Sequence, residues 1–258
     1  MKTRRRKDTH FKLYMIRHGI SCGNMNYHLK DELALGLYTD PELTQEGRAI
    51  LKNVRQKMKE HIDGPYIVGA SNLIRAQQTA QLLFNPKTIY IVPAIGEFGR
   101  HNQENTALRP SVQSSVFTDI TKDESIIKKR NYSFFVENPS MTDMTQVSVF
   151  LEWLGTYYKK MANATKHSRP NLVFVSHYGF INELICNVKC LETNYLSNSA
   201  LIEFDVSIVD DKAKLNSVRQ IHYIDNDKLR VDISKNLATD KCRIPLKGNR
   251  KTHKKRRL

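Results

Sequence analysis

Short apolar runs alternate with helical patterns along most of this 258-residue chain, and this alternation constrains the fold more than any other feature. Four runs rich in β-branched residues are expected to form strands, at residues 11–16, 66–68, 88–92 and 172–175. Strands separated by helices form crossover units, which build a mostly parallel sheet with helices on both faces. The sequence therefore predicts an α/β fold.

Three segments between these strands carry apolar residues at the three-to-four spacing of an amphipathic helix. The first follows Pro41 and has Thr44 as a candidate N-cap, and the second follows Ser71. The third begins near Asp143 and Gln146, which stand at capping-box spacing. We expect these three segments to be the helices that cover the sheet.

Two further regions complete the expected domain. Residues 200–207 and 217–223 predict two late strands joined by a turn, which would form an antiparallel edge. Residues 99–142 are polar, have no clear periodicity and are too long for a simple connection. We interpret them as a partly helical insertion.

The net charge of +15 is concentrated at the two ends of the chain. Residues 1–12 carry six Lys or Arg and one Asp, and residues 241–258 carry nine Lys or Arg and no acid, which leaves about +1 for residues 13–240. Because both ends lack apolar residues, we expect two basic disordered segments flanking a single domain over 13–240. Weak contact of these ends with nucleic acid or an anionic surface is one expected use of their charge.

The cysteines and the hydropathy pattern bear on the cellular location. Cys22, Cys186, Cys190 and Cys242 form no C-x-x-C pair and are interpreted as reduced thiols of an intracellular protein, in the cytoplasm or nucleus. No apolar stretch approaches the ~20 residues of a membrane span, and the basic first residues lack the apolar core of a signal peptide. Nothing in the sequence indicates the oligomeric state.

Polar side chains follow each of the four predicted strands, at the edge where an open parallel sheet places its ligand site. Two of them, Arg17 and His18, follow the first strand, and Arg75 lies in the helix after the second. Glu97 follows the third strand and His177 the fourth. We expect these five side chains to converge on one site.

Two guanidiniums and a second imidazole around His18 suit a phosphate dianion, because arginine offers rigid paired donors to phosphate oxygens. The same charges are expected to lower the pKa of His18 and leave it neutral and nucleophilic. Glu97 would give a proton to the leaving oxygen and later take one from water, and Glu104 nearby is an alternative acid. Since arginines neutralise the phosphate charge, this chemistry requires no metal and no cofactor.

The blocks of sequence around these residues resemble the histidine phosphatase superfamily, in its first, phosphoglycerate-mutase-like branch. The resemblance covers roughly residues 11–206 in order, through Leu13 to Gly19 with Asn24, Asp40-Pro41 to Gly47, Ser71 to Ala80, Ile95-Gly96-Glu97, Ser176 to Gly179, and Asn198-Ser199. It implies the fold of that family and a phosphohistidine intermediate at His18. It also implies phosphate binding by Arg17, Arg75 and His177 with help from Asn24, and Glu97 as the proton donor.

A metal-independent phosphatase acting on a phosphorylated substrate is the function that this resemblance favours. Glycolytic mutases of the family usually have Glu-Ser directly after Arg-His-Gly and a Trp just before the Asn, where this chain has Ile20-Ser21 and Gly23. After the acid they have Arg-His-Tyr-Gly, whereas residues 98–101 here are Phe-Gly-Arg-His. Phosphoglycerate-mutase-type transfer is the alternative activity, and a non-catalytic nucleic-acid-binding protein that uses its basic ends is the alternative of another class. The sequence does not indicate which phosphomonoester is the substrate.

Overall fold

A single mixed sheet organises the computed structural model, which describes residues 8–24, 39–98, 103–108, 130–131, 147–165, 167–189 and 196–222. Within these residues the strand order is β4-β3-β2-β5-β1-β6-β7. The strands are β1 (Thr9–Arg17), β2 (Tyr66–Ala70), β3 (Ile89–Ile91), β4 (Arg130–Asn131), β5 (Asn171–Ser176), β6 (Leu201–Val209) and β7 (Lys212–His222).

The pairing is parallel through most of the sheet and antiparallel at one edge. The strands β1, β5, β2, β3 and β4 pair in parallel, in that spatial order. At the other side β1 pairs antiparallel with β6, and β6 pairs antiparallel with β7. The hairpin turns at Asp210 and Asp211, both with positive φ, as a two-residue hairpin turn requires. The α/β prediction and the antiparallel edge are confirmed.

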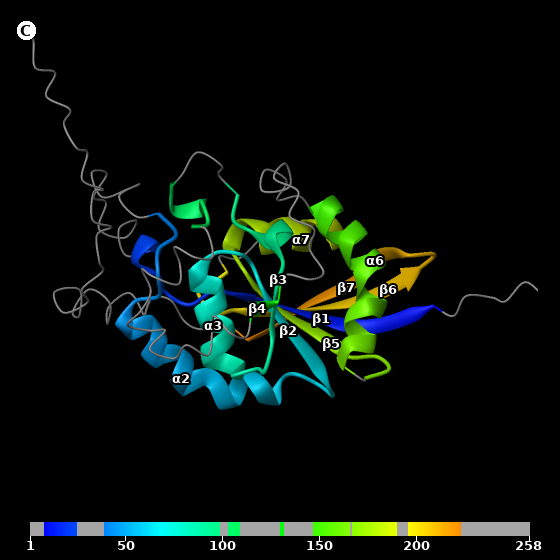
Figure 1. Cartoon of the computed structure of the whole chain (residues 1–258), viewed down its shortest axis with the longest axis horizontal. Helices are drawn as coiled ribbons and strands as arrows, with labels where there is room; N and C mark the ends of the chain where they lie inside the picture. The colour runs from blue at the N-terminus through cyan, green and yellow to red at the C-terminus, as the bar shows by residue number, and fades with distance from the viewer. Residues whose placement is uncertain are drawn as a thin grey trace, which may run out of the picture.

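Helices cover both faces of the sheet, as expected. The α-helices are α2 (Gln45–Glu60), α3 (Ile74–Phe84), α6 (Val147–Thr165) and α7 (Tyr178–Val188), and two short 3-10 helices are η1 (Pro93–Ile95) and η2 (Gln103–Asn105). The helices α2 and α3 lie together on one face, and α6 and α7 lie on the other (Figure 1). The predicted N-cap is confirmed, because the Thr44 hydroxyl accepts a hydrogen bond from the Gly47 amide at 2.9 Å.

The central strand β1 separates two hydrophobic cores through the alternation of its side chains. Leu13 and Met15 pack into the core under α6 and α7, whereas Tyr14 and Ile16 pack into the core under α2 and α3. All four side chains are fully buried. Burial on both faces leaves the ends of the strand as the places where it can present polar groups.

The sequence did not predict α7. Its signals were present, because Phe180, Ile181, Leu184 and Ile185 form a buried stripe at helical spacing. The helix begins directly after His177, so it fixes the direction of the backbone at a candidate site residue.

The structure differs from the expected boundaries at the N-terminal end. Strand β1 begins at Thr9, so residues 9–12 belong to the sheet and not to a basic disordered segment. Pairing of Thr9 with Ile208 and an ion pair of Lys12 with Asp63 at 2.8 Å hold this part of the strand. Residues 1–7 and 241–258 lie outside the described residues.

Most of the expected insertion at 99–142 also lies outside the described residues, as do the capping residues Asp143 and Gln146. Its described parts are residues 103–108, which include η2, and the short strand β4. Among the helices that the structure describes, none combines the length and hydropathy that crossing a membrane requires.

The cysteines differ from the expectation of four reduced thiols. Cys22 takes part in a disulfide, whereas Cys186 does not. The other two cysteines lie outside the described residues. Sequence spacing carried no sign of this bond, since Cys22 is far along the chain from every other cysteine.

Candidate active site

The five predicted side chains come from four successive parallel strands. Arg17 ends β1 and His18 follows it, while Arg75 lies in the first turn of α3 after β2. Glu97 follows η1 after β3, and His177 connects β5 to α7. The structure brings all five together at the carboxyl edge of the sheet, as the contacts described below show.

His18 is held in one orientation by its backbone and by its ring. Its amide donates to the Ser176 carbonyl at 3.0 Å, which ties it to the neighbouring strand β5. Ring Nδ1 lies 2.6 Å from the Gly19 carbonyl oxygen, an acceptor, so Nδ1 carries a proton. Ring Nε2 accepts a hydrogen bond from Arg75 Nε at 3.3 Å and therefore keeps its lone pair toward the site.

The electrostatic surroundings keep His18 uncharged. The residue is 2% exposed, and burial is the main reason why its pKa lies well below the usual value. The positive charges of Arg75 and Arg17 lower this pKa further. A neutral imidazole with a bare Nε2 is the form that can act as a nucleophile near pH 7.

Arg75 presents its guanidinium between His18 and the segment that contains η2. Besides the contact with His18, Nη1 donates to the Glu104 carbonyl at 2.8 Å and Nη2 donates to Asn105 Oδ1 at 3.0 Å. Asn105 was not among the residues singled out from the sequence.

Arg17 and His177 form another wall of the site, and of these two only Arg17 is charged. The Arg17 guanidinium donates to the Leu196 carbonyl and lies 5.3 Å from the ring centre of Tyr178. His177 is fully buried, and its ring centre lies 5.0 Å from that of His18. Burial, and then the charges of Arg75, His18 and Arg17, hold the pKa of His177 well below its usual value.

Glu97 is anchored through one carboxylate oxygen. Oε1 accepts from the amides of Phe98 and Gly179, each at 3.0 Å. Burial raises the pKa of Glu97, although Arg75 and the two amide bonds act in the opposite direction. Only a glycine fits at position 179, because an added Cβ would lie 2.6 Å from Glu97 Oε1.

The alternative acid, Glu104, is placed differently. Its backbone carbonyl contacts Arg75, and its carboxylate lies beside Gly23, where an added Cβ would come within 3.0 Å of Oε2. Glu97, by contrast, is held at the first turn of α7, directly after His177. Of the two acids, Glu97 is therefore the one bonded to the helix that follows His177.

Asn24 is fixed through its side-chain oxygen. Oδ1 accepts from the Ser21 amide at 3.0 Å, from the Ser21 hydroxyl at 3.1 Å and from Asn198 Nδ2 at 3.2 Å. The same Asn198 amide donates to the carbonyls of His18 and Gly19. Asn198 therefore links Asn24 to the loop that carries the nucleophile, a role the sequence motif did not reveal.

Asp40 joins two segments that approach the site. This buried residue has a positive φ of 51°, and its Oδ1 accepts from the Ile74 amide at 2.8 Å, at the start of α3. Oδ2 accepts from the Leu108 amide at 3.1 Å. One carboxylate thus holds both the helix that carries Arg75 and the segment that contacts its guanidinium.

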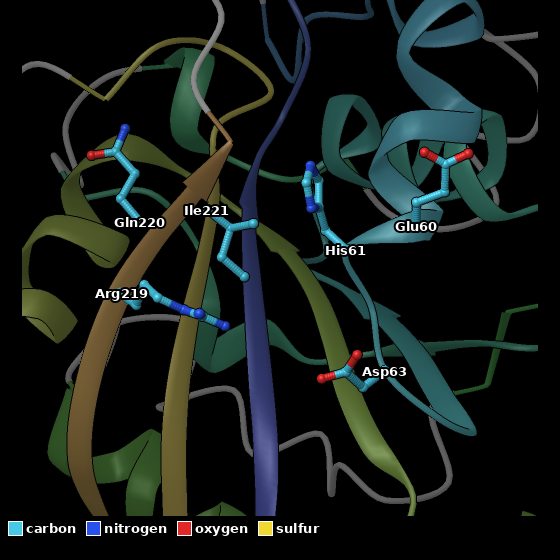
Figure 2. Close-up of a pocket in the computed structure, with 6 residues that line it drawn as sticks. All are labelled: Glu60, His61, Asp63, Arg219, Gln220 and Ile221. Carbon is cyan, nitrogen blue, oxygen red and sulfur yellow. The ribbon is translucent and has the colours of Figure 1, made fainter.

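The structure also has a pocket of about 360 Å³ whose lining includes none of the five residues (Figure 2). It is lined by Glu60, His61, Asp63, Arg219, Gln220 and Ile221. The Arg219 guanidinium is paired with Glu203 at 2.8 Å, and Asp63 is paired with Lys12 at 2.8 Å. The guanidinium of this pocket is bonded to a carboxylate, whereas the Arg75 guanidinium is bonded to a carbonyl, an amide oxygen and a neutral imidazole. The site around His18 therefore suits a phosphate dianion better.

Measurements of phosphate binding distinguish the site around His18 from the pocket of Figure 2. Arg75→Ala is expected to weaken binding of inorganic phosphate about 10- to 100-fold, the usual cost of losing hydrogen bonds between charged groups. Arg219→Ala, which removes a guanidinium at the pocket of Figure 2, is the matched control and is expected to leave the affinity unchanged. Isothermal titration calorimetry measures the phosphate affinity of both variants. A loss of affinity in Arg219→Ala but not in Arg75→Ala would place the phosphate site in the pocket of Figure 2.

Solved structures similar to this chain include several phosphatases. The phosphoserine phosphatase of Entamoeba histolytica, in complex with phosphoserine, is 22% identical, with 81% of this chain and 96% of that chain covered and a TM-score of 0.44. A putative α-ribazole-5′-phosphate phosphatase of Escherichia coli is 19% identical, with 83% and 98% covered and a TM-score of 0.45. A mycobacterial glucosyl-3-phosphoglycerate phosphatase is 14% identical, with 80% and 98% covered and a TM-score of 0.48. No curated protein sequence matches the chain.

A family model matches the first half of the described domain. Residues 13–110 match the histidine phosphatase superfamily (branch 1). This range contains Arg17, His18, Asn24, Arg75 and Glu97, while His177 lies beyond it and is placed by the structure alone. The resemblance drawn from the sequence is confirmed over residues 13–110, which are similar to branch 1 of the histidine phosphatase superfamily.

Proposed function

We propose that this protein is a metal-independent phosphatase that hydrolyses a phosphomonoester through a phosphohistidine intermediate at His18. One observation carries the proposal: the proton on Nδ1 is committed to the Gly19 carbonyl, so Nε2 is bare beside Arg75. The match of residues 13–110 to the histidine phosphatase superfamily supports phosphoryl transfer as the chemistry. A phosphatase is favoured over a mutase because Ile20 and Gly23 differ from the residues that glycolytic mutases usually have at these positions.

In the first step His18 Nε2 attacks phosphorus while the bond from phosphorus to the leaving oxygen breaks. Glu97, which burial keeps protonated to higher pH than an ordinary carboxyl, gives its proton to that oxygen. Arg17, Arg75 and Asn24 bind the non-bridging oxygens, whose charge spreads outward in the transition state. The alcohol product then leaves.

In the second step water attacks the phosphoryl group on His18. Glu97, now ionised, takes a proton from that water, and the bond from phosphorus to Nε2 breaks. Inorganic phosphate is released, and both residues return to their starting protonation states. Two successive displacements therefore use one nucleophile and one carboxyl group.

The intermediate can be trapped directly. Rapid quenching with a labelled phosphomonoester is expected to yield a phosphoryl adduct on His18 that is stable to alkali and labile to acid, and activity is expected to persist in EDTA. His18→Ala is expected to abolish both turnover and adduct, whereas His167→Ala, an exposed histidine away from the site, should leave both intact. Full activity of His18→Ala would refute the mechanism, and faster isomerisation of 3-phosphoglycerate than phosphate release would indicate a mutase.

The role of Glu97 predicts a dependence on the leaving group. Glu97→Gln is expected to lower kcat/KM for an alkyl phosphate by about 10²- to 10⁴-fold, because the leaving alkoxide needs a proton. For p-nitrophenyl phosphate kcat/KM should change little, since its leaving group departs unprotonated, although kcat should fall because water activation is lost. Steady-state kinetics with both substrates separate these effects.

The role of Glu97 as a proton donor also predicts how kcat/KM changes with pH. Glu97 must be protonated in the first step, so kcat/KM for an alkyl phosphate is expected to fall as the pH rises through the raised pKa of this residue. Glu97→Gln is expected to lose that alkaline limb. If the limb persists in Glu97→Gln and disappears in Glu104→Gln, then Glu104 is the acid.

A further inference from the structure

The hydroxyl of Ser71 contacts the ring of His177. Ser71 directly follows β2, is fully buried, and has its Oγ 2.6 Å from His177 Nε2. Ser71 and His177 each directly follow one of two neighbouring strands, because β2 and β5 pair in parallel up to this edge. The contact is therefore built into the register of the sheet.

The direction of this hydrogen bond follows from the other contact of the hydroxyl. Ser71 Oγ also accepts a hydrogen bond from the Leu73 amide, at 3.3 Å. A serine hydroxyl has one proton to donate, and within the described residues His177 Nε2 is the acceptor it reaches. Nε2 is thus the bare nitrogen of His177, and in the neutral ring the proton lies on Nδ1.

That Nδ1 group has no hydrogen-bond partner among the residues that the structure describes, although the side chain is fully buried. A buried donor without an acceptor is unfavourable, because it has lost its hydrogen bonds to water. The ring stands beside that of His18, with 5.0 Å between the ring centres. An oxygen of a phosphoryl group on or near His18 is the acceptor that this position lacks.

We propose that Ser71 is a positioning residue that locks His177 in the tautomer with its proton on Nδ1, so that His177 donates to the phosphoryl group during transfer. The proposal rests on the proposed function, because the acceptor is the transferred group. Without the hydroxyl, the ring could place its proton on Nε2 and present a lone pair to a phosphate oxygen. Two lone pairs facing each other would repel, so the tautomer decides whether His177 attracts or opposes the phosphoryl group.

The tautomer can be read in the resting protein by ¹⁵N NMR of histidine-labelled chain, which distinguishes a protonated from a bare ring nitrogen. In the wild type we expect His177 to carry its proton on Nδ1. In Ser71→Ala we expect a mixture of tautomers or the opposite one, and in Ser71→Thr, which keeps the hydroxyl, we expect the wild-type tautomer. A wild-type His177 with its proton on Nε2 overturns the proposal.

Binding and kinetics test the consequence of the tautomer. Ser71→Ala is expected to weaken binding of inorganic phosphate and to lower kcat/KM, each by about 10- to 100-fold, the usual cost of removing the group that orients a histidine. Ser71→Thr is expected to recover most of both. Wild-type phosphate affinity in Ser71→Ala, together with an altered tautomer, would show that His177 does not donate to phosphate and would overturn the proposal.

Ser176→Ala is the matched control for lost packing and stability. Ser176 is equally buried at the same edge of the sheet, and its hydroxyl donates to the Ile95 carbonyl at 2.7 Å instead of to a ring. We expect a similar loss in Tm but an unchanged His177 tautomer. If the wild type binds phosphate and shows the Nδ1 tautomer but hydrolyses no phosphomonoester, the proposed function fails while the assignment of Ser71 stands.

Discussion

The contact between Arg75 Nε and His18 Nε2 sets the requirement that the rest of the site meets. A guanidinium can donate to this nitrogen only while the imidazole is uncharged, and burial together with a second guanidinium at Arg17 keeps it uncharged. The Gly19 carbonyl then accepts a hydrogen bond from the ring proton on Nδ1. A nucleophile of defined tautomer and a ready set of anion donors thus follow from the same arrangement.

Segments far apart in the chain maintain this arrangement. Asp40 ties the start of α3 to the segment after η2, and Asn198 ties Asn24 to the loop at His18. The backbone of His18 is bonded to Ser176 on β5, next to His177. These anchors hold the side chains at the carboxyl edge of the sheet. Small shifts between strands would therefore displace the reacting atoms.

The sequence was sufficient to predict which chemical groups meet, because topology alone brings the ends of parallel strands to one edge. His18, Arg75 and His177 were predicted on this ground, and the structure places them in contact or side by side. The tautomers were beyond reach, since they depend on acceptors such as the Gly19 carbonyl that every residue possesses. The anchoring role of Asp40 could not be predicted either, because its partners Ile74 and Leu108 are 34 and 68 positions further along the chain.

In the fold too, elements with a regular hydrophobic pattern were predicted from the sequence, and elements held by specific long-range contacts were not. The apolar run at residues 11–16 predicted a strand in a sheet covered on both faces, and the structure confirms it. The start of that strand at Thr9 was missed, because Lys12 is held by pairing with Asp63 and Glu203, which composition cannot reveal. For the polar region 99–142, whose described parts contact Arg75, no periodicity was available to predict the contact.

The charge state of His18 is the property on which the account depends most directly. It can be measured by ¹⁵N NMR of histidine-labelled protein over a pH titration, with resonances assigned by comparison with His18→Ala. We expect His18 to remain neutral, with Nδ1 protonated and Nε2 bare, from pH 8 to well below its ordinary pKa of about 6.5. Titration of His18 near that ordinary value, or a proton on Nε2 at neutral pH, would contradict the account.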